Sequence, residues 1–278
     1  AVAVRLQDGS IHTDTMDINP EPEWVKHFPI VRGVYSFFHS LILGISSLYK
    51  SASYFEDEDE KEKAEKNPAK EKAEMGFSLV ISFILALAIF LYLPMFLSGS
   101  VTHFTTAKWV PILFEGILRI VIFLLYIYLI SLTPDIKRTF MYHGAEHKCI
   151  NCVEHDLPLT VENVRKSSRY HKRCGTSFIF IVFIISVVLF MFIRTDNPGL
   201  KLLFRLLLMP VIAGISYEFL RLGGRSDNVV VNALSQPGLW VQRLTTKEPD
   251  DSMIEVGITS VRAVFDPEKF IKDHELQQ

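Results

Sequence analysis

The sequence predicts an α-helical polytopic membrane protein with about four transmembrane helices. Of its 278 residues 49% are hydrophobic, and its 29 basic and 31 acidic side chains avoid several long windows and crowd into the segments between them. An apolar helix needs roughly 20 residues to cross the hydrocarbon core of a bilayer, and the uncharged windows are about that long. The net charge of −2 argues against a nucleic-acid-binding protein, which normally carries a basic excess on one face.

Residues 1–55 combine a predicted hairpin with a predicted helix. Apolar and polar residues alternate over the first six positions, and a turn at Asp8-Gly9 follows, which is typical of a short β-hairpin. The stretch 30–49 is apolar and aromatic but is interrupted by Arg32, His39 and several small residues. This mixture favours an interfacial or re-entrant helix over a membrane span.

A charged linker and a membrane core follow. Residues 56–74 are almost wholly Glu, Asp, Lys and Ala, a composition that cannot bury enough apolar surface to fold by itself. Residues 75–222 form the predicted four-helix transmembrane core. Its predicted spans are 75–97, 109–132, 176–193 and 202–222. The last contains Pro210, which predicts a kink or a helix that faces protein instead of lipid.

The distribution of basic residues predicts the orientation. The loop 134–175 carries eight Lys and Arg residues, whereas the links 98–108 and 194–201 are short and poor in charge. By the positive-inside rule we expect this loop and both termini on the cytoplasmic side of the membrane. The tail 223–278 is predicted to be an ordered cytoplasmic segment.

The densest group of chemically active side chains is His143-Gly144-Ala145-Glu146-His147, an H-x-x-E-H sequence. If the stretch is helical, His143 and His147 lie one turn apart on one face, so their two imidazoles can bind one divalent ion. This is the inverted zincin order. In that chemistry the metal activates a water molecule, and Glu146 would be the general base that takes its proton.

A catalytic zinc ion needs a third protein ligand and an open position. Glu218 is one candidate, because it lies well downstream, as the third ligand of inverted zincins does, and an unpaired carboxylate at membrane depth is costly. Cys174 and His171 are the others, because they lie just before the predicted third span and near the membrane surface. The sequence leaves these alternatives open.

All three cysteines of the chain fall in the same loop, which favours a metal site in this loop. Cys149 and Cys152 form a C-x-x-C sequence, so an alternative is a structural zinc site that they share with His171 and Cys174. That alternative leaves His143 and His147 unexplained and leaves no open position on the metal. A redox dithiol is a weaker alternative, since no βαβ pattern surrounds the two cysteines.

Two ionisable residues lie inside the second predicted span. Glu115 and Arg119 are four positions apart and therefore face the same way on a helix. Charged residues at membrane depth are costly unless they are paired, so we expect the two to neutralise each other. The alternative is that they line a polar pathway.

Four motifs occur in order along nearly the whole chain. They are His143-Gly144-Ala145-Glu146-His147-Lys148, His171-Lys172-Arg173-Cys174-Gly175-Thr176-Ser177, Ser216-Tyr217-Glu218, and Pro237-Gly238-Leu239-Trp240 with Glu248-Pro249-Asp250-Asp251. Together they resemble the YqhQ-like bacterial membrane proteins of the DUF1385 family. The resemblance implies a metal-dependent membrane protein of bacteria but supplies no substrate. Members of that family usually begin with a glycine-rich segment, which this chain lacks.

These observations lead to a functional expectation with two rivals. The first hypothesis is a metal-dependent hydrolase of the bacterial cytoplasmic membrane, with zinc as the expected cofactor. A peptide bond in a membrane-associated protein is the most natural substrate, which would make it a metalloprotease, and a lipid-linked ester or amide is the alternative. The second is a membrane scaffold or assembly factor with a structural metal. The third is a transporter that uses Glu115, Arg119 and Glu218. The lipid bilayer is the expected partner in each case, nucleic acid is not, and a homo-oligomer is left open.

Overall fold

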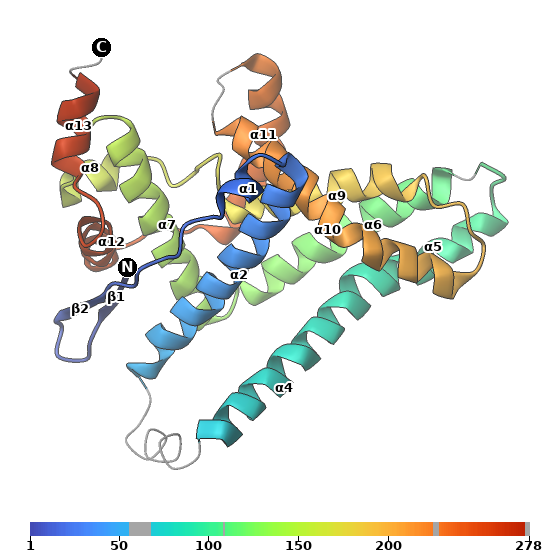
Figure 1. Ribbon diagram of the computed structural model, residues 1–278, viewed down its shortest axis with the longest axis horizontal. Helices are drawn as coiled ribbons and strands as arrows, with labels where there is room; N and C mark the ends of the chain where they lie inside the picture. The colour runs from blue at the N-terminus through green and yellow to red at the C-terminus, as the bar shows by residue number, and fades with distance from the viewer. Residues whose placement is uncertain (56–67, 108, 225–227, 276–278) are drawn as a thin grey trace.

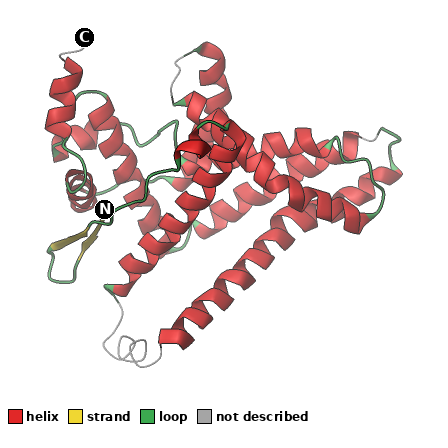
Figure 2. Cartoon of the chain, in the orientation of Figure 1, coloured by secondary structure: helices red, strands yellow, loops and turns green. Residues whose placement is uncertain are grey.

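Helices make up most of the computed structural model, which describes residues 1–55, 68–107, 109–224 and 228–275 (Figure 2). The predicted N-terminal hairpin is confirmed. Strands β1 (Val2–Arg5) and β2 (Ile11–Asp14) pair in antiparallel register with Val2 opposite Asp14. The connecting turn contains Gly9 with φ +86°, a conformation that glycine adopts without strain.

Among the described residues, four helical segments are long and apolar enough to cross a membrane, which confirms the predicted fold class. They are α2 (Pro29–Ser53), the continuous stretch Ala73–His103, α6 (Trp109–Ile130) and α10 (Pro198–Gly223). The second of these comprises most of α4 (Pro68–Leu87), the π-helix η1 (Ala88–Tyr92), α5 (Leu93–Gly99) and the 3₁₀-helix η2 (Ser100–His103). The predicted span at 176–193 forms the shorter helix α9 (Gly175–Phe190), which has 16 residues.

One difference from the sequence-based expectation concerns α2. An interfacial or re-entrant helix was expected there, but α2 is a continuous helix of 25 residues that meets the length and composition of a span. Two of its interruptions have partners on α10. Arg32 forms an ion pair with Glu218, and a Cβ atom on Gly33 would lie 2.5 Å from the carbonyl oxygen of Gly214. Small residues let two helices approach this closely.

The predicted charged linker lies only partly within the described residues. Positions 56–67 are outside them, and 68–74 form the first turns of α4. In Figure 1, α4 projects from the other helices, and only its C-terminal end approaches α6. Many apolar side chains of α4 are exposed, as expected for a helix that faces lipid, because lipid tails are as apolar as these side chains.

A buried ionic network joins the membrane helices. Glu115 accepts from Arg119 at 2.7 Å and from Arg205 of α10 at 2.6 and 2.7 Å. Arg119 also donates to Ser186 of α9 at 2.7 Å. The pairing that the sequence predicts for Glu115 and Arg119 is therefore present, and Arg205 extends it to a third helix.

The same network reaches the irregular part of the second span, Ala73–His103. Pro94 has no N–H group, so the carbonyl of Phe90, four residues earlier, lacks its usual helical donor. Arg119 Nε donates to this carbonyl at 2.9 Å. A side chain of α6 thus satisfies the backbone group that proline leaves open in the neighbouring helix.

Outside these spans the chain folds into a smaller helical cluster. It contains α7 (Pro134–Glu154), α8 (Val161–Lys166), α12 (Asp251–Arg262) and α13 (Pro267–Glu275), and Figure 1 shows it beside the hairpin, away from α4 and α5. Its apolar core is formed by Cys149, Cys152, Val153, Leu159, Val164 and Ile254. Arg5 of β1 binds Glu255 of α12 at 2.7 Å. A short helix α1 (Glu23–Lys26) precedes α2, and α11 (Val229–Thr245) packs on α9.

Candidate metal centre

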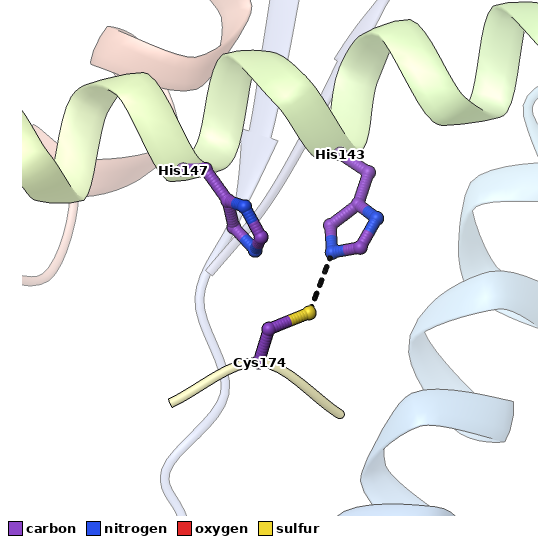
Figure 3. Close-up of side chains that lie close together, drawn as sticks. All are labelled: His143, His147 and Cys174. Atoms are coloured by element: carbon purple, nitrogen blue, oxygen red, sulfur yellow. Dashed lines mark hydrogen bonds between the residues drawn. The ribbon is translucent and has the colours of Figure 1, made fainter. Parts of the chain in front are cut away.

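The H-x-x-E-H sequence is helical, as predicted, and lies in the second half of α7. His143 and His147 are therefore one turn apart, and their ring centroids are separated by 4.4 Å. Figure 3 shows both imidazoles pointing toward Cys174. His147 is buried and His143 is half-buried.

Cys174 completes a group of three candidate ligands. It is the N-cap residue of α9, and its Sγ lies 3.3 Å from Nε2 of His143. The candidate ligand atoms of His143, His147 and Cys174 all lie within 4.8 Å of one another. Thr176 Oγ1 is a further neighbour of the sulfur, at 3.2 Å. Of the three alternatives for the third ligand, the structure thus brings Cys174 to the histidine pair.

Both histidines are held through the nitrogen that faces away from Cys174. His143 Nδ1 lies 2.8 Å from the carbonyl oxygen of Thr245, and His147 Nδ1 lies 2.7 Å from that of Arg169. Because a carbonyl only accepts, each Nδ1 carries the proton, and in the neutral rings each Nε2 keeps a free lone pair. This arrangement is typical of histidines that bind metals.

The loop that leads to Cys174 is fixed by side chains of α7. Lys148 donates to the carbonyls of Arg165 and Ser167 at 2.9 Å each. Asn151 donates to the carbonyls of Ser168 and Tyr170 at 2.7 and 3.0 Å. Backbone carbonyls need partners when they are buried, and here α7 supplies them. One helix thus carries two candidate ligands and holds the loop of the third.

Gln242 of α11 fixes the same loop from the other side. Its side chain is fully buried, accepts from the N–H of His171 at 2.9 Å, and donates to the carbonyl of His171 at 2.8 Å and to Ser177 at 2.9 Å. His171 lies before Cys174 in the loop, and Ser177 follows it in the first turn of α9. Nearby, a Cβ atom on Gly238 would lie 2.6 Å from Ser177 Oγ, so α11 crosses α9 at close range.

The three side chains also affect one another's protonation. Burial alone would raise the pKa of the Cys174 thiol, but hydrogen bonds to His143 and His147 outweigh burial and lower this pKa to about 5. Burial alone would lower the pKa of His143, but the interaction with Cys174 raises it overall. The metal-free site therefore favours the thiolate form of Cys174, and this thiolate in turn favours the protonated form of His143. Thiolate is the form of cysteine that binds metals.

A cavity of about 820 Å³ lies next to this group. Its walls come from α2, α10, the start of α9 and His143 of α7, and Cys174 is part of its lining. A volume of this size is in the range of small-molecule binding sites. Two of the three candidate ligands therefore border a space that a ligand could occupy.

Comparison with known proteins places the chain in a family. A family model described as a protein of unknown function (DUF1385) matches residues 28–267. The uncharacterized protein YqhQ of Bacillus subtilis (strain 168) is 38% identical over 270 residues, which cover 93% of this chain and 84% of the relative. The chain belongs to the DUF1385 family. No solved structure matches this family member.

The other predicted site residues of this DUF1385 protein have different neighbours. The carboxylate of Glu218 binds Arg32 at 3.0 and 2.5 Å, and it is not in the group of three. His171 Nε2 lies 3.0 Å from Glu154, and its ring centroid is 5.9 Å from that of His147. Glu146 is exposed and forms no hydrogen bond or ion pair with any residue that the structure describes. The role of Glu146 as a general base stays a prediction.

The C-x-x-C cysteines of the DUF1385 chain lie in a different environment. Cys149 and Cys152 are free thiols, fully buried in the apolar core between α7, α8 and α12. Burial raises the pKa of Cys149 to about 12, which leaves it protonated at neutral pH. Neither belongs to the candidate ligand group, so the structure does not assemble the Cys149, Cys152, His171 and Cys174 alternative.

Several residues that hold the site were not identified from the sequence. Thr245 and Arg169 contribute backbone carbonyls, which no side-chain pattern reveals. Gln242 and Asn151 contribute amides, and amides are common on helix surfaces, so they give no distinctive signal. The only available signal for Gln242 was its place on α11 shortly after Pro237-Gly238-Leu239-Trp240, one of the four motifs.

Proposed function

We propose that this protein is a membrane-embedded, metal-dependent hydrolase in which His143, His147 and Cys174 hold a zinc ion. The observation that carries the proposal is the meeting of these three side chains within 4.8 Å beside a cavity of about 820 Å³. Three protein ligands leave a fourth coordination position free, which distinguishes catalytic from structural zinc sites. Here the free position has a cavity next to it.

The donor set fits zinc. Two imidazoles and a thiolate are typical ligands of zinc, whereas magnesium and calcium prefer oxygen ligands. Each histidine also has the supporting hydrogen bond from Nδ1 to a backbone carbonyl that fixes the ring and its tautomer. Among the other candidates, Glu218 and His171 already have charged partners, which supports Cys174 as the third ligand.

Each residue then has a separate task. A zinc ion bound here would act as a Lewis acid and lower the pKa of water to about 7. Glu146 is the proposed general base, because it lies on the same helix as both histidines and no partner in the described chain occupies its carboxylate. The apolar side chains of the cavity, among them Phe37 and Phe178, would bind the substrate and exclude bulk water.

We place the protein in the bacterial cytoplasmic membrane with the site on the cytoplasmic side. The support is the set of basic residues in 134–175 and the apolar helices on either side of that segment. The substrate is then either a membrane protein that is cleaved at a peptide bond or a lipid-linked ester or amide. In both cases the apolar part would lie against the apolar side chains that α2 and α10 contribute to the cavity.

The first test is the metal content of detergent-purified protein by elemental mass spectrometry. We expect about one zinc per chain in the wild type, and its loss in His143→Ala, His147→Ala and Cys174→Ser. The matched control is His155→Ala, because His155 is an exposed histidine at the end of the same helix. Wild-type protein without stoichiometric metal after chelator-free purification contradicts the proposal.

The second test separates an enzyme from a scaffold with a structural metal. Glu146→Gln should keep its zinc and its melting temperature but lose at least about 100-fold in turnover, the usual range for a general base. The assay uses fluorogenic acyl esters, acyl amides and apolar peptides in micelles. A wild type that binds zinc but cleaves none of them, and that unfolds when zinc is removed, would favour the scaffold.

A further inference from the structure

The cavity beside Cys174 has a lining of two kinds. Its apolar part consists of Phe37, Leu41, Phe178, Ile179 and Leu220. Its charged part consists of Arg173 and Arg221, and none of the described residues that line it is acidic. The cavity therefore combines an apolar surface with positive charge only.

The two arginines differ in their partners. Arg173 forms an ion pair with Glu154. Arg221 is half-buried near the end of α10, and it forms no hydrogen bond or ion pair with any residue in the described part of the chain. A guanidinium group has five donors in a planar fork that matches a phosphate or carboxylate. Arg221 is thus available to an anion that enters the cavity.

The position of the cavity indicates the nature of the apolar part of its ligand. Two of its walls, α2 and α10, are helices long and apolar enough to cross a membrane. Arg221 lies at the last turn of α10, where a spanning helix reaches the headgroup region. Basic pockets between such helices recognise anionic lipid headgroups.

The lining also favours a hydrocarbon chain over a peptide. Each peptide unit carries a donor and an acceptor that need partners when they are buried. The cavity offers few hydroxyl groups, and two of these are engaged, Ser36 with Glu21 and Thr176 with Cys174. A hydrocarbon chain needs no such partners.

From these observations we propose that the cavity binds a lipid with a phosphate headgroup, whose phosphate pairs with Arg221 and whose hydrocarbon chain lies against Phe37, Leu41 and Phe178. This binding would bring the bonds near the headgroup to His143 and Cys174. Lipid binding can be measured without catalysis. The assignment of this lipid as the substrate rests on the proposed hydrolase function.

The test is native mass spectrometry of the purified full chain, titrated with two probes that share one oleoyl chain. Lysophosphatidic acid carries a phosphate, and monooleoylglycerol does not. We expect the wild type to bind the first about tenfold more tightly, which corresponds to one charge-assisted hydrogen-bonded contact. Inorganic phosphate at the same concentration should not displace it.

Variants identify the site. Arg221→Gln should remove the preference for the phosphate-bearing probe. Leu41→Trp should lower the affinity for both probes, because the larger side chain fills the cavity. Arg243→Gln, at the end of α11 and outside the lining, is the charge-matched control. His143→Ala should lose metal but keep the lipid, so failure of the metal proposal and failure of lipid binding are distinguishable.

Three results would overturn the inference. The first is equal wild-type affinity for the two probes, and the second is an unchanged phosphate preference in Arg221→Gln. The third is displacement of lysophosphatidic acid by an apolar peptide that binds more tightly and does so equally in Arg221→Gln. That last result would assign the cavity to a peptide substrate.

Discussion

Nε2 of His143 lies 3.3 Å from Sγ of Cys174, although 31 positions separate the two residues in the chain. The intervening segment leaves α7, forms α8 and returns, and its return path is fixed by Lys148, Asn151 and Gln242. The contact is therefore a product of tertiary structure. Its properties lead to predictions on the site and on the helices around it.

The reactivity of Cys174 should depend on pH in a defined way. Because its pKa is lowered to about 5, it is a thiolate above that pH, and its reaction with iodoacetamide in metal-free protein should be nearly constant from pH 6 to 8 and fall as the pH drops through 5. Cys149, with its pKa raised to about 12 and its side chain buried, should not react. Peptide mass spectrometry measures each site.

Two controls test the cause of this reactivity. His143→Ala removes a hydrogen bond that lowers the pKa of Cys174, so the midpoint of its pH profile should move upward. Zinc added at neutral pH should protect the thiolate. A wild-type profile with an ordinary midpoint near 8.5 would show that the histidines do not lower the pKa of the Cys174 thiol.

Gln242 should be a positioning residue for the metal. Gln242→Leu leaves the backbone N–H and C=O of His171 without their partners, so the loop that carries Cys174 should shift. We expect zinc affinity to fall about 10- to 100-fold, as it does when residues that orient metal ligands are removed. Competition with a chromophoric chelator measures the affinity, and Gln236→Leu, at an exposed position of the same helix, should leave it unchanged.

The ion pair between Arg32 and Glu218 should stabilise the contact between α2 and α10. Glu218→Gln leaves a largely buried guanidinium without its anion, and we expect a loss of about 1–3 kcal/mol in the free energy of unfolding. Thermal unfolding in detergent measures the loss. The double variant Arg32→Met with Glu218→Leu should regain much of it. Zinc content should stay near one per chain, and its loss in a folded Glu218→Gln protein would make Glu218 a ligand.

The buried network at Glu115 should respond asymmetrically to substitution. Glu115→Gln leaves Arg119 and Arg205 buried without an anion, so we expect a loss of about 3–5 kcal/mol or failure to fold. Arg205→Met leaves the pair of Glu115 and Arg119 balanced and should cost less. Expression level and denaturation in mixed micelles compare the two variants. Equal losses would mean that shape, and not charge, decides the stability of this region.

The sequence predicted the helical class and the hairpin because hydrophobic windows and turn residues are local signals. It also placed His143 and His147 on one helix face, since that follows from a four-residue spacing. It left the third ligand among Glu218, Cys174 and His171 open, because the answer depends on which groups have other partners. Arg32 and Glu154 supply those partners, and no local pattern links Arg32 to a residue 186 positions away.

The same limit explains why the sequence predicts an interfacial or re-entrant helix where α2 forms a helix long enough to span a membrane. Its arginine and glycines reduce its average hydropathy, and they were interpreted as interruptions. In the structure Arg32 and Gly33 contact α10, where Arg32 pairs with Glu218 and Gly33 lies against Gly214. Composition alone cannot separate a polar residue that faces water from one that is paired inside a helix bundle.

The helix α7 serves two parts of the protein at once. One of its faces directs His143 and His147 toward Cys174, and another inserts Cys149 into the core shared with α12. Its backbone is also tied to the tail, because the backbone N–H of Lys247 donates to the carbonyl of Phe140 at 2.9 Å and Gly144 has no room for a Cβ atom beside the carbonyl of Lys247. A chain cut after α10 would keep all three candidate ligands and lose the frame that aligns them. The tail is as much a part of the site as the ligands themselves.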